Sequence, residues 1–171
     1  MQHTITFRPA KSSDASLILE FVRELATYEK LLHEVEADEK SLAEYLFGEK
    51  AYAEVILAFA GETPAGFCLF FHNFSTFVGR PGIYIEDVFV RPEFRGHGIG
   101  KQFFGQLATI ATERGCGRIE WWVLDWNQPA IDFYCSLGAK PMDEWTVYRI
   151  TRDRFQALRT DASSLGGMGE K

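Results

Sequence analysis

The chain has 171 residues, the size of one domain with one hydrophobic core. Hydrophobic residues make up 46% of it and charged residues 25%, a balance that excludes a disordered polar chain. The net charge of −6 argues against general binding to nucleic acid, because such binding needs a basic face to meet the phosphates.

The three cysteines, Cys68, Cys116 and Cys135, are widely spaced and form no Cys-x-x-Cys pair, so neither a disulfide framework nor a zinc site is indicated. The four histidines show no metal-ligand spacing, and we expect no metal cofactor. Because no disulfide framework is indicated, we expect the protein to be in a reducing compartment, the cytoplasm. The first residues do not resemble a signal peptide. No stretch approaches the ~18 apolar residues of a spanning helix, so we expect no membrane partner.

In chain order, residues 3–8 alternate like a strand, and Pro9 ends them. A helix follows, capped by Ser12, Ser13 or Asp14 and ending near Leu31 or Leu32, because its apolar residues recur at helical spacing. A second helix is predicted over residues 38–47, stopped by Gly48. Three strands then occupy residues 52–60, 65–74 and 82–90, with a turn at 61–64.

A long helix is predicted over residues 99–114 and a strand over 119–125. Pro129 suits the first turn of a helix that reaches Leu137. A last strand is predicted over residues 145–150 and a final helical turn over 153–158. The expected order is β-α-α-β-β-β-α-β-α-β, an α/β class with a mixed sheet. We expect one domain over residues 1–158 and a flexible tail over 159–171, because that tail is small, polar and Gly-rich.

The central motif is the loop Arg95-Gly96-His97-Gly98-Ile99-Gly100, with Lys101 after it, between a strand and a helix. Glycines let backbone N–H groups approach an anion, and a helix N-terminus adds partial positive charge, so phosphate is the natural ligand. The loop fails the P-loop pattern and the dinucleotide pattern, since neither set of glycine spacings fits.

With Arg95, Gly98 and Gly100 at the spacing Gln/Arg-x-x-Gly-x-Gly/Ala, the chain resembles the GNAT acetyltransferase superfamily. The strand 83–90 and the segment 126–134 match as well, and the resemblance covers residues 4–158. Within the superfamily, residues 24–29, 84–87 and the Asn127, Pro129, Phe133, Tyr134 pattern resemble the spermidine/spermine group, also called diamine or thialysine acetyltransferases. The chain departs from that group over residues 141–145.

The resemblance implies an N-acetyltransferase that uses acetyl-CoA. It implies that the strand over residues 88–90 offers backbone groups to the pantetheine arm. Asn127 is expected near that arm, or equally as the N-cap of its helix. The implied cofactor contacts are Val88, Phe89, Val90, Arg95, Gly96, His97, Gly98, Ile99, Gly100, Lys101, Asn127, Phe133 and Tyr134.

Glu86 is the candidate general base, because a carboxylate in an apolar central strand is costly without a role or a partner. It would act directly or through water; the alternative is a carboxylate held by a buried Arg or by backbone amides. Strand alternation groups Tyr84, Glu86, Val88 and Val90 on one face and Ile85, Asp87 and Phe89 on the other. Tyr134 is the candidate acid for the leaving thiolate, with an ordinary core tyrosine as the alternative.

Tyr28 and Glu29 resemble the amine-contacting pair of the group, and Glu86 and Asp87 extend this set. Glu120, Trp121 and Trp122 are further candidates to line the acceptor pocket, with one of the tryptophans in the core. The acidic segment 24–49 would attract a cationic amine, although a solvated helical face also explains most of its charges.

The expected acceptor is therefore a polyamine, a diamine or a lysine-like amino acid. The alternatives are a protein amine, an aminoglycoside, or a non-catalytic acyl-CoA sensor. Members of the family are commonly dimers, and we expect a homodimer.

Overall fold

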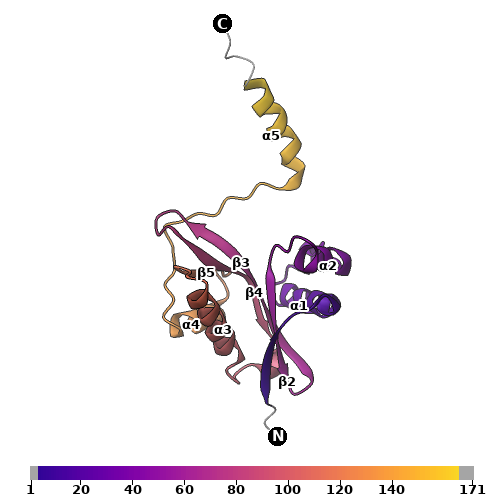
Figure 1. Cartoon of the computed structure of the whole chain (residues 1–171), viewed down its shortest axis with the longest axis vertical. Helices are drawn as coiled ribbons and strands as arrows, with labels where there is room; N and C mark the ends of the chain where they lie inside the picture. Colours follow the sequence, from indigo (N-terminus) through magenta and orange to yellow (C-terminus); the bar gives the residue numbers. More distant parts are fainter. Residues whose placement is uncertain (1–3, 166–171) are drawn as a thin grey trace. The chain divides into compact units, whose positions relative to one another are not determined.

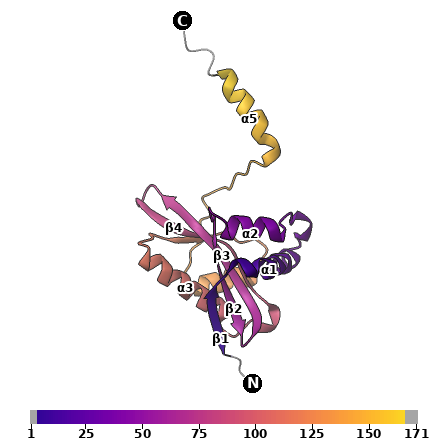
Figure 2. The same cartoon turned by 45° about the vertical axis from the view of Figure 1, so that its right-hand side comes forward.

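Five strands form one mixed sheet in the order β1-β2-β3-β4-β5 in the computed structural model, which describes residues 4–165 (Figures 1 and 2). The strands are β1 (Ile5–Pro9), β2 (Glu54–Ala60), β3 (Thr63–Ser75), β4 (Arg80–Val90) and β5 (Ile119–Trp121). Neighbouring strands pair antiparallel from β1 to β4, and β5 pairs parallel with β4. Residue 3, part of the first predicted strand, lies outside the described residues.

Helices cover both faces of this sheet, as Figure 1 shows. α1 (Ala15–Tyr28) and α2 (Glu39–Phe47) lie on one face, and α3 (Ile99–Glu113) crosses the other between β4 and β5. α1 ends where Lys30 takes a positive φ of 63° and Leu31 N–H donates to the Ala26 carbonyl at 2.7 Å. α2 begins at a capping box, in which Asp38 Oδ1 accepts from Ser41 N at 2.7 Å.

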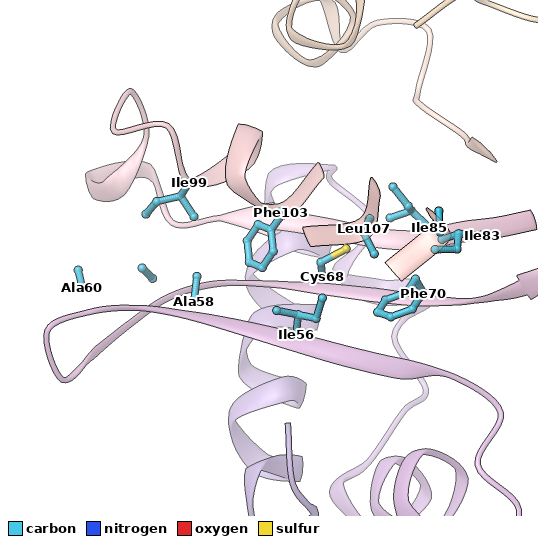
Figure 3. Packing of buried hydrophobic residues seen from close by; sticks show 12 residues of the cluster. Ile56, Ala58, Ala60, Cys68, Phe70, Ile83, Ile85, Ile99, Phe103 and Leu107 are labelled. Atoms are coloured by element: carbon cyan, nitrogen blue, oxygen red, sulfur yellow. The ribbon is translucent and has the colours of Figure 1, made fainter. Parts of the chain in front are cut away.

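The core has two parts, one on each face. On the α3 face, Phe103 and Leu107 pack against Ile56, Cys68 and Phe70 of the sheet (Figure 3). The second cluster, on the α1 face, consists of Ile18, Phe21, Leu46, Val55, Leu57, Phe67 and Phe89. β2 and β3 supply residues to both clusters in alternation, which is why these strands are apolar on both faces.

A β-bulge in β4 changes which residues share a face. Leu69 pairs with Asp87 and Phe70 with Ile85, so Glu86 is an extra residue without a partner on β3. As a result Ile85 lies with Val88 in the α3-side cluster, whereas Phe89 lies in the α1-side cluster. The predicted alternation through residues 84–90 is therefore wrong, because the inserted residue shifts the pattern by one.

The predicted strand over residues 145–150 is wrong as well, since this segment has no regular secondary structure. Its β-branched and aromatic residues favour a strand, but a strand exists only when a neighbour completes its hydrogen bonds. In the described part of the chain no ladder includes it, and Trp145, Val147, Tyr148 and Ile150 are exposed. The predicted strand over 119–125 shortens to β5, which pairs with only three residues of β4.

The chain divides into two compact units, residues 1–130 and residues 131–171. α4 (Gln128–Ser136) spans this boundary, and α5 (Arg152–Leu165) belongs to the second unit. α5 continues past Leu158, where the tail was expected to begin, and residues 166–171 lie outside the described residues. Every helix among residues 4–165 is too short or too polar to cross a bilayer. The remaining element order is as predicted.

Candidate functional site

The central feature of the site is the place where β4 and β5 separate. The two strands pair only through Ile83–Ile119, Tyr84–Glu120 and Ile85–Trp121. Beyond Ile85, β4 continues to Val90 beside β3, but β5 has ended, so residues 86–90 have no β5 partner in the described structure. A strand edge of this kind can pair with an extended ligand that carries amide groups.

The glycine loop follows this free edge. Gly96 and Gly98 both take a φ of +78°, in the left-handed region that favours glycine, and Gly98 is the N-cap of α3. The first helical hydrogen bond runs from Gln102 N to Gly98 O at 3.0 Å, so the amides before Gln102 have no partner inside the helix. These amides and the helix dipole suit a phosphate group.

The other side chains of the loop are buried, exposed or hydrogen-bonded to backbone carbonyls nearby. Ile99 is buried in the α3-side core, and Lys101 is exposed at the start of the helix. The His97 ring is turned to the loop, with its Nδ1 at 2.9 Å from the Arg95 carbonyl oxygen. Arg95 Nε donates to the Val90 carbonyl at 2.9 Å, and its guanidinium lies over the Tyr28 ring.

Three carboxylates gather where β4 bulges. Glu86 is exposed, and no ion-pair partner lies within reach of it among the described side chains. Asp87, one residue on, shares the α1 side with Leu69 and Phe89. Burial, together with the charges of Glu86 and Glu29, raises the pKa of Asp87 to about 7. Burial also raises the pKa of Glu29, which follows the last residue of α1.

The β5 residues have different environments. Glu120 accepts a hydrogen bond from Asn73 Nδ2 at 2.9 Å and forms an ion pair with Arg118 at 2.8 Å. Trp121 packs edge-on against Phe104 in the α3-side core. Trp122 is exposed and meets the Tyr84 ring edge-on, with ring centroids 5.6 Å apart. Burial, then the charges of Glu86 and Glu120, raises the pKa of Tyr84 to about 12.

Asn127 joins the end of α1 to the start of α4. The Tyr28 hydroxyl donates to Asn127 Oδ1 at 3.1 Å, and Asn127 is buried. The same oxygen accepts from Ala130 N at 3.4 Å, a long bond in the position of a helix cap. In the second unit, the Phe133 and Tyr134 rings lie 5.5 Å apart, centroid to centroid, on α4. Cys135 beside them is exposed, whereas burial raises the pKa of the Cys68 thiol.

The structure thus has a parallel pair that splits and a left-handed glycine cap after it, and comparison with known proteins shows the family. The profile of the Acetyltransferase (GNAT) family matches residues 19–139. The chain belongs to the GNAT acetyltransferase family. It is accordingly an N-acetyltransferase, and its mixed five-stranded sheet with flanking helices is the GNAT fold.

Several relatives of this GNAT protein are similar over nearly their whole length. Thialysine N-epsilon-acetyltransferase of Sus scrofa is 37% identical over 164 residues, covering 91% of this chain and 96% of the relative. L-ornithine N5-acetyltransferase of Arabidopsis thaliana is 30% identical, with 88% and 86% covered. Among solved structures, an integron cassette protein of V. cholerae has a TM-score of 0.75 at 29% identity, covering 93% of this chain and 98% of that one.

The sequence reasoning missed one residue that the structure places at the base of the loop. Arg91 directly follows the free edge of β4, and its side chain is only 14% exposed. It pairs with Glu24 and Glu20 of α1. The signals were present: an arginine between an apolar strand and Pro92, and two glutamates four residues apart on a predicted helix.

Asp87→Asn is expected to change the pH dependence of stability. Because the folded protein holds the Asp87 proton up to a pKa of about 7 whereas the unfolded chain releases it near the ordinary value, the stability falls as the pH rises toward 7 and is constant above it. The melting temperature of the variant should rise relative to that of the wild type between about pH 4 and about pH 7, the interval between the ordinary and the raised pKa of Asp87. Thermal unfolding across that interval measures it.

Asp14→Asn is the control of opposite sign. The Arg8 guanidinium beside Asp14 lowers the pKa of that carboxyl, so its stabilisation is present at neutral pH and lost on acidification. This variant should be less stable than the wild type at neutral pH and approach it in acid. Parallel pH profiles for wild type and Asp87→Asn would contradict the assignment of a raised pKa to Asp87.

Proposed function

We propose that the protein transfers an acetyl group from acetyl-CoA to the primary amine of a small cationic acceptor, with a lysine-like amino acid first, then a diamine or polyamine. The observation that carries this is the group of Glu29, Glu86 and Asp87 beside the free edge of β4. Three carboxylates in a partly desolvated place favour a cation, which also favours the ionised form of Asp87. The relatives whose printed names specify thialysine and L-ornithine act on amines of this class.

The residues present fit coenzyme A. The amides of the glycine loop suit its pyrophosphate, and the unpaired groups over residues 88–90 suit the amides of its pantetheine arm. We propose that Asn127 and Phe133 line that arm and that Tyr134 lies near its sulfur end. When bound, acetyl-CoA supplies the acetyl group as a thioester, and we propose no metal ion in the reaction.

The proposed chemistry begins with the acceptor amine. A primary amine of this kind has a pKa near ~10 and arrives protonated, so a base must take its proton before it attacks. Glu86 is the proposed base, directly or through one water, and its exposure without an ion-pair partner leaves it open to a ligand. A backbone N–H of residues 88–90 polarises the thioester carbonyl of acetyl-CoA. Tyr134 O–H donates the proton that the departing sulfur takes.

Release of free thiol from acetyl-CoA, measured with a panel of amines, tests the function. We expect turnover with thialysine, ornithine or spermidine. Turnover only with an aminoglycoside or a peptide amine would favour the alternative acceptors. The solved aminoglycoside acetyltransferase with a TM-score of 0.69 shares the fold at 20% identity and says nothing of the acceptor. Tight binding of coenzyme A with no turnover on any amine would instead identify a sensor.

Tyr134→Phe is expected to lower kcat by about two orders of magnitude, the usual size of a lost general acid, while the affinity for coenzyme A changes little. Steady-state kinetics and calorimetry measure the two quantities. Tyr52→Phe is the matched control, because Tyr52 is 58% exposed and has no proposed role. An unchanged kcat for Tyr134→Phe would remove the acid role.

Glu86→Gln should lower kcat/KM about a hundredfold at neutral pH, because the amine then lacks a base. The deficit should shrink as the pH approaches the pKa of the free amine, near ~10, where the acceptor loses its proton unaided. A pH profile of kcat/KM shows this, with Glu62→Gln, an exposed residue of the β2–β3 turn, as control. A deficit that stays constant with pH would argue against the base role.

We propose that the protein is a cytoplasmic homodimer; fractionation of host cells tests the location. Trp145, Val147, Tyr148 and Ile150 are exposed large apolar residues within one short segment, and such residues favour an interface. Light scattering should give a mass about twice the 19.5 kDa of one chain. Val147→Asp should lower that mass, whereas Phe77→Asp, at a still more exposed apolar residue in the β3–β4 turn, should not. A monomeric wild type would contradict the proposal.

A further inference from the structure

One face of α1 holds the segment that leads from β4 to the glycine loop. Glu20, Glu24 and Tyr28 stand four residues apart, so they project from the same side of the helix. Glu20 and Glu24 contact Arg91, and Tyr28 contacts Arg95. The two arginines flank the short 3-10 turn Pro92–Phe94, which connects the free edge of β4 to Gly96.

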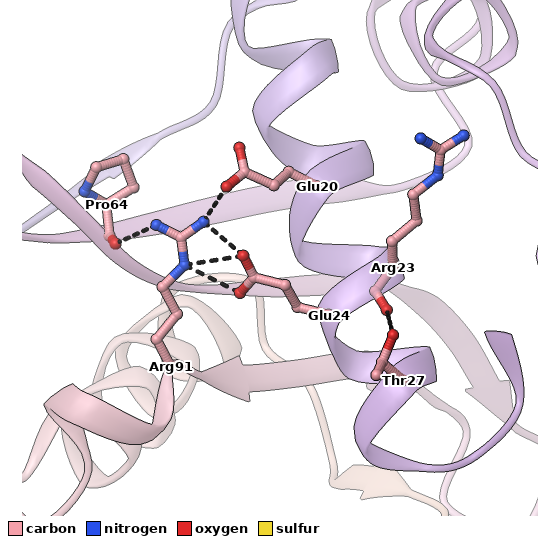
Figure 4. A network of polar contacts seen from close by, with 6 residues as sticks. All are labelled: Glu20, Arg23, Glu24, Thr27, Pro64 and Arg91. Atoms are coloured by element: carbon pink, nitrogen blue, oxygen red, sulfur yellow. Dashed lines mark hydrogen bonds and ion pairs between the residues drawn. The ribbon is translucent and has the colours of Figure 1, made fainter.

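Arg91 uses its whole guanidinium in this contact (Figure 4). Its Nε donates to Glu24 Oε2 at 2.9 Å, and one terminal nitrogen donates to Glu24 Oε1 at 2.7 Å and also to Glu20. The other terminal nitrogen donates to the Pro64 carbonyl at 3.0 Å. The guanidinium also lies 4.7 Å from the centroid of the Phe21 ring. A forked pair with a carboxylate fixes direction as well as distance.

The backbone of Arg91 is fixed at the same point, since its N–H donates to the Ala65 carbonyl at 2.9 Å. Arg91 therefore joins α1, the start of β3 and the end of β4 at one residue. Four residues later, Arg95 Nε returns to the Val90 carbonyl, and its guanidinium lies 4.8 Å from the centroid of the Tyr28 ring. Both ends of the turn are held, and only then does the chain enter the two left-handed glycines.

We infer that Arg91 is a positioning residue for the coenzyme A loop, and that it acts through Glu24 and Glu20 of α1. The inference rests on the proposed use of acetyl-CoA. Backbone amides bind an anion well only when they already point at it, because ordering them on binding costs free energy. Arg91 touches none of the proposed reacting groups; it sets the direction in which the loop leaves the sheet.

Calorimetric titration with coenzyme A tests this on Arg91→Met, Arg91→Lys and Glu24→Gln. We expect Arg91→Met and Glu24→Gln to raise Kd about tenfold, the equivalent of about 1.4 kcal/mol. The Kd of Arg91→Lys should lie between theirs and that of the wild type, because an ammonium keeps the charge but cannot make the forked pair with Glu24. KM for acetyl-CoA should rise with Kd, while kcat at saturation stays within about twofold, as expected for lost ground-state binding.

Arg8→Met is the matched control. Arg8 also makes a forked pair, to Asp14 at 2.7 and 2.8 Å, and its guanidinium lies 4.9 Å from the Phe59 ring centroid. It lies on β1, outside the proposed coenzyme site. Arg8→Met should lower the melting temperature as Arg91→Met does, yet leave Kd for coenzyme A unchanged.

An unchanged Kd in Arg91→Met and Glu24→Gln, or an equal rise in Arg8→Met, would overturn the positioning role and leave a merely structural ion pair. If Arg91→Met does not fold, Glu24→Gln and Arg91→Lys decide the question, because both retain most of the packing. A wild type that binds no coenzyme A would overturn the proposed use of acetyl-CoA and this inference together. Binding by the wild type with no effect in the variants would overturn the inference alone.

Discussion

The separation of β4 from β5 after only three residue pairs determines how the site is built. A parallel pair needs a continuous ladder, and here the ladder stops after the pair of Ile85 and Trp121. The ladder stops at the bulge at Glu86, which adds one residue to β4. Beyond the bulge, β4 continues to pair with β3 but no longer with β5. Bulges commonly end pairing and redirect side chains near active sites. The free edge of β4 and the position of Asp87 on the α1 side of the sheet are consequences of this bulge, and the glycine loop begins where the free edge ends.

Charge is distributed around that point in two ways. The carboxylates of Glu29, Glu86 and Asp87 have no cation paired to them in the described structure, and burial, with the charges of the other two, raises the pKa of Asp87. Glu24 and Glu20, roughly one and two turns earlier on α1, instead both pair with Arg91. One helix thus offers structural acids at its middle and unpaired acidity at its end. Along α1, therefore, Glu20 and Glu24 are paired with a cation, whereas Glu29 at its end has no such partner in the described structure.

Much of the architecture was predictable because it depends on local rules. Helical apolar spacing predicted α1 and α3, the glycine spacing of residues 96–100 predicted the loop before α3, and Asp38 marked the start of α2. The faces of β4 were not predictable, because the bulge at Glu86 depends on β3 pairing and leaves no mark in β4 itself. Propensity also favoured a strand over residues 145–150, but propensity cannot supply the neighbour that a strand needs.

The antiparallel strands β2, β3 and β4 follow one another through short turns, whereas β5 reaches β4 only after the whole of α3. Contacts between residues far apart in sequence form more slowly, since more chain entropy is lost in closing the loop. Residues 54–90 are also synthesised before β5, and domains begin to fold during translation. The meander can therefore assemble first as a template, and the opening between β4 and β5 forms only when β5 docks against three residues of β4.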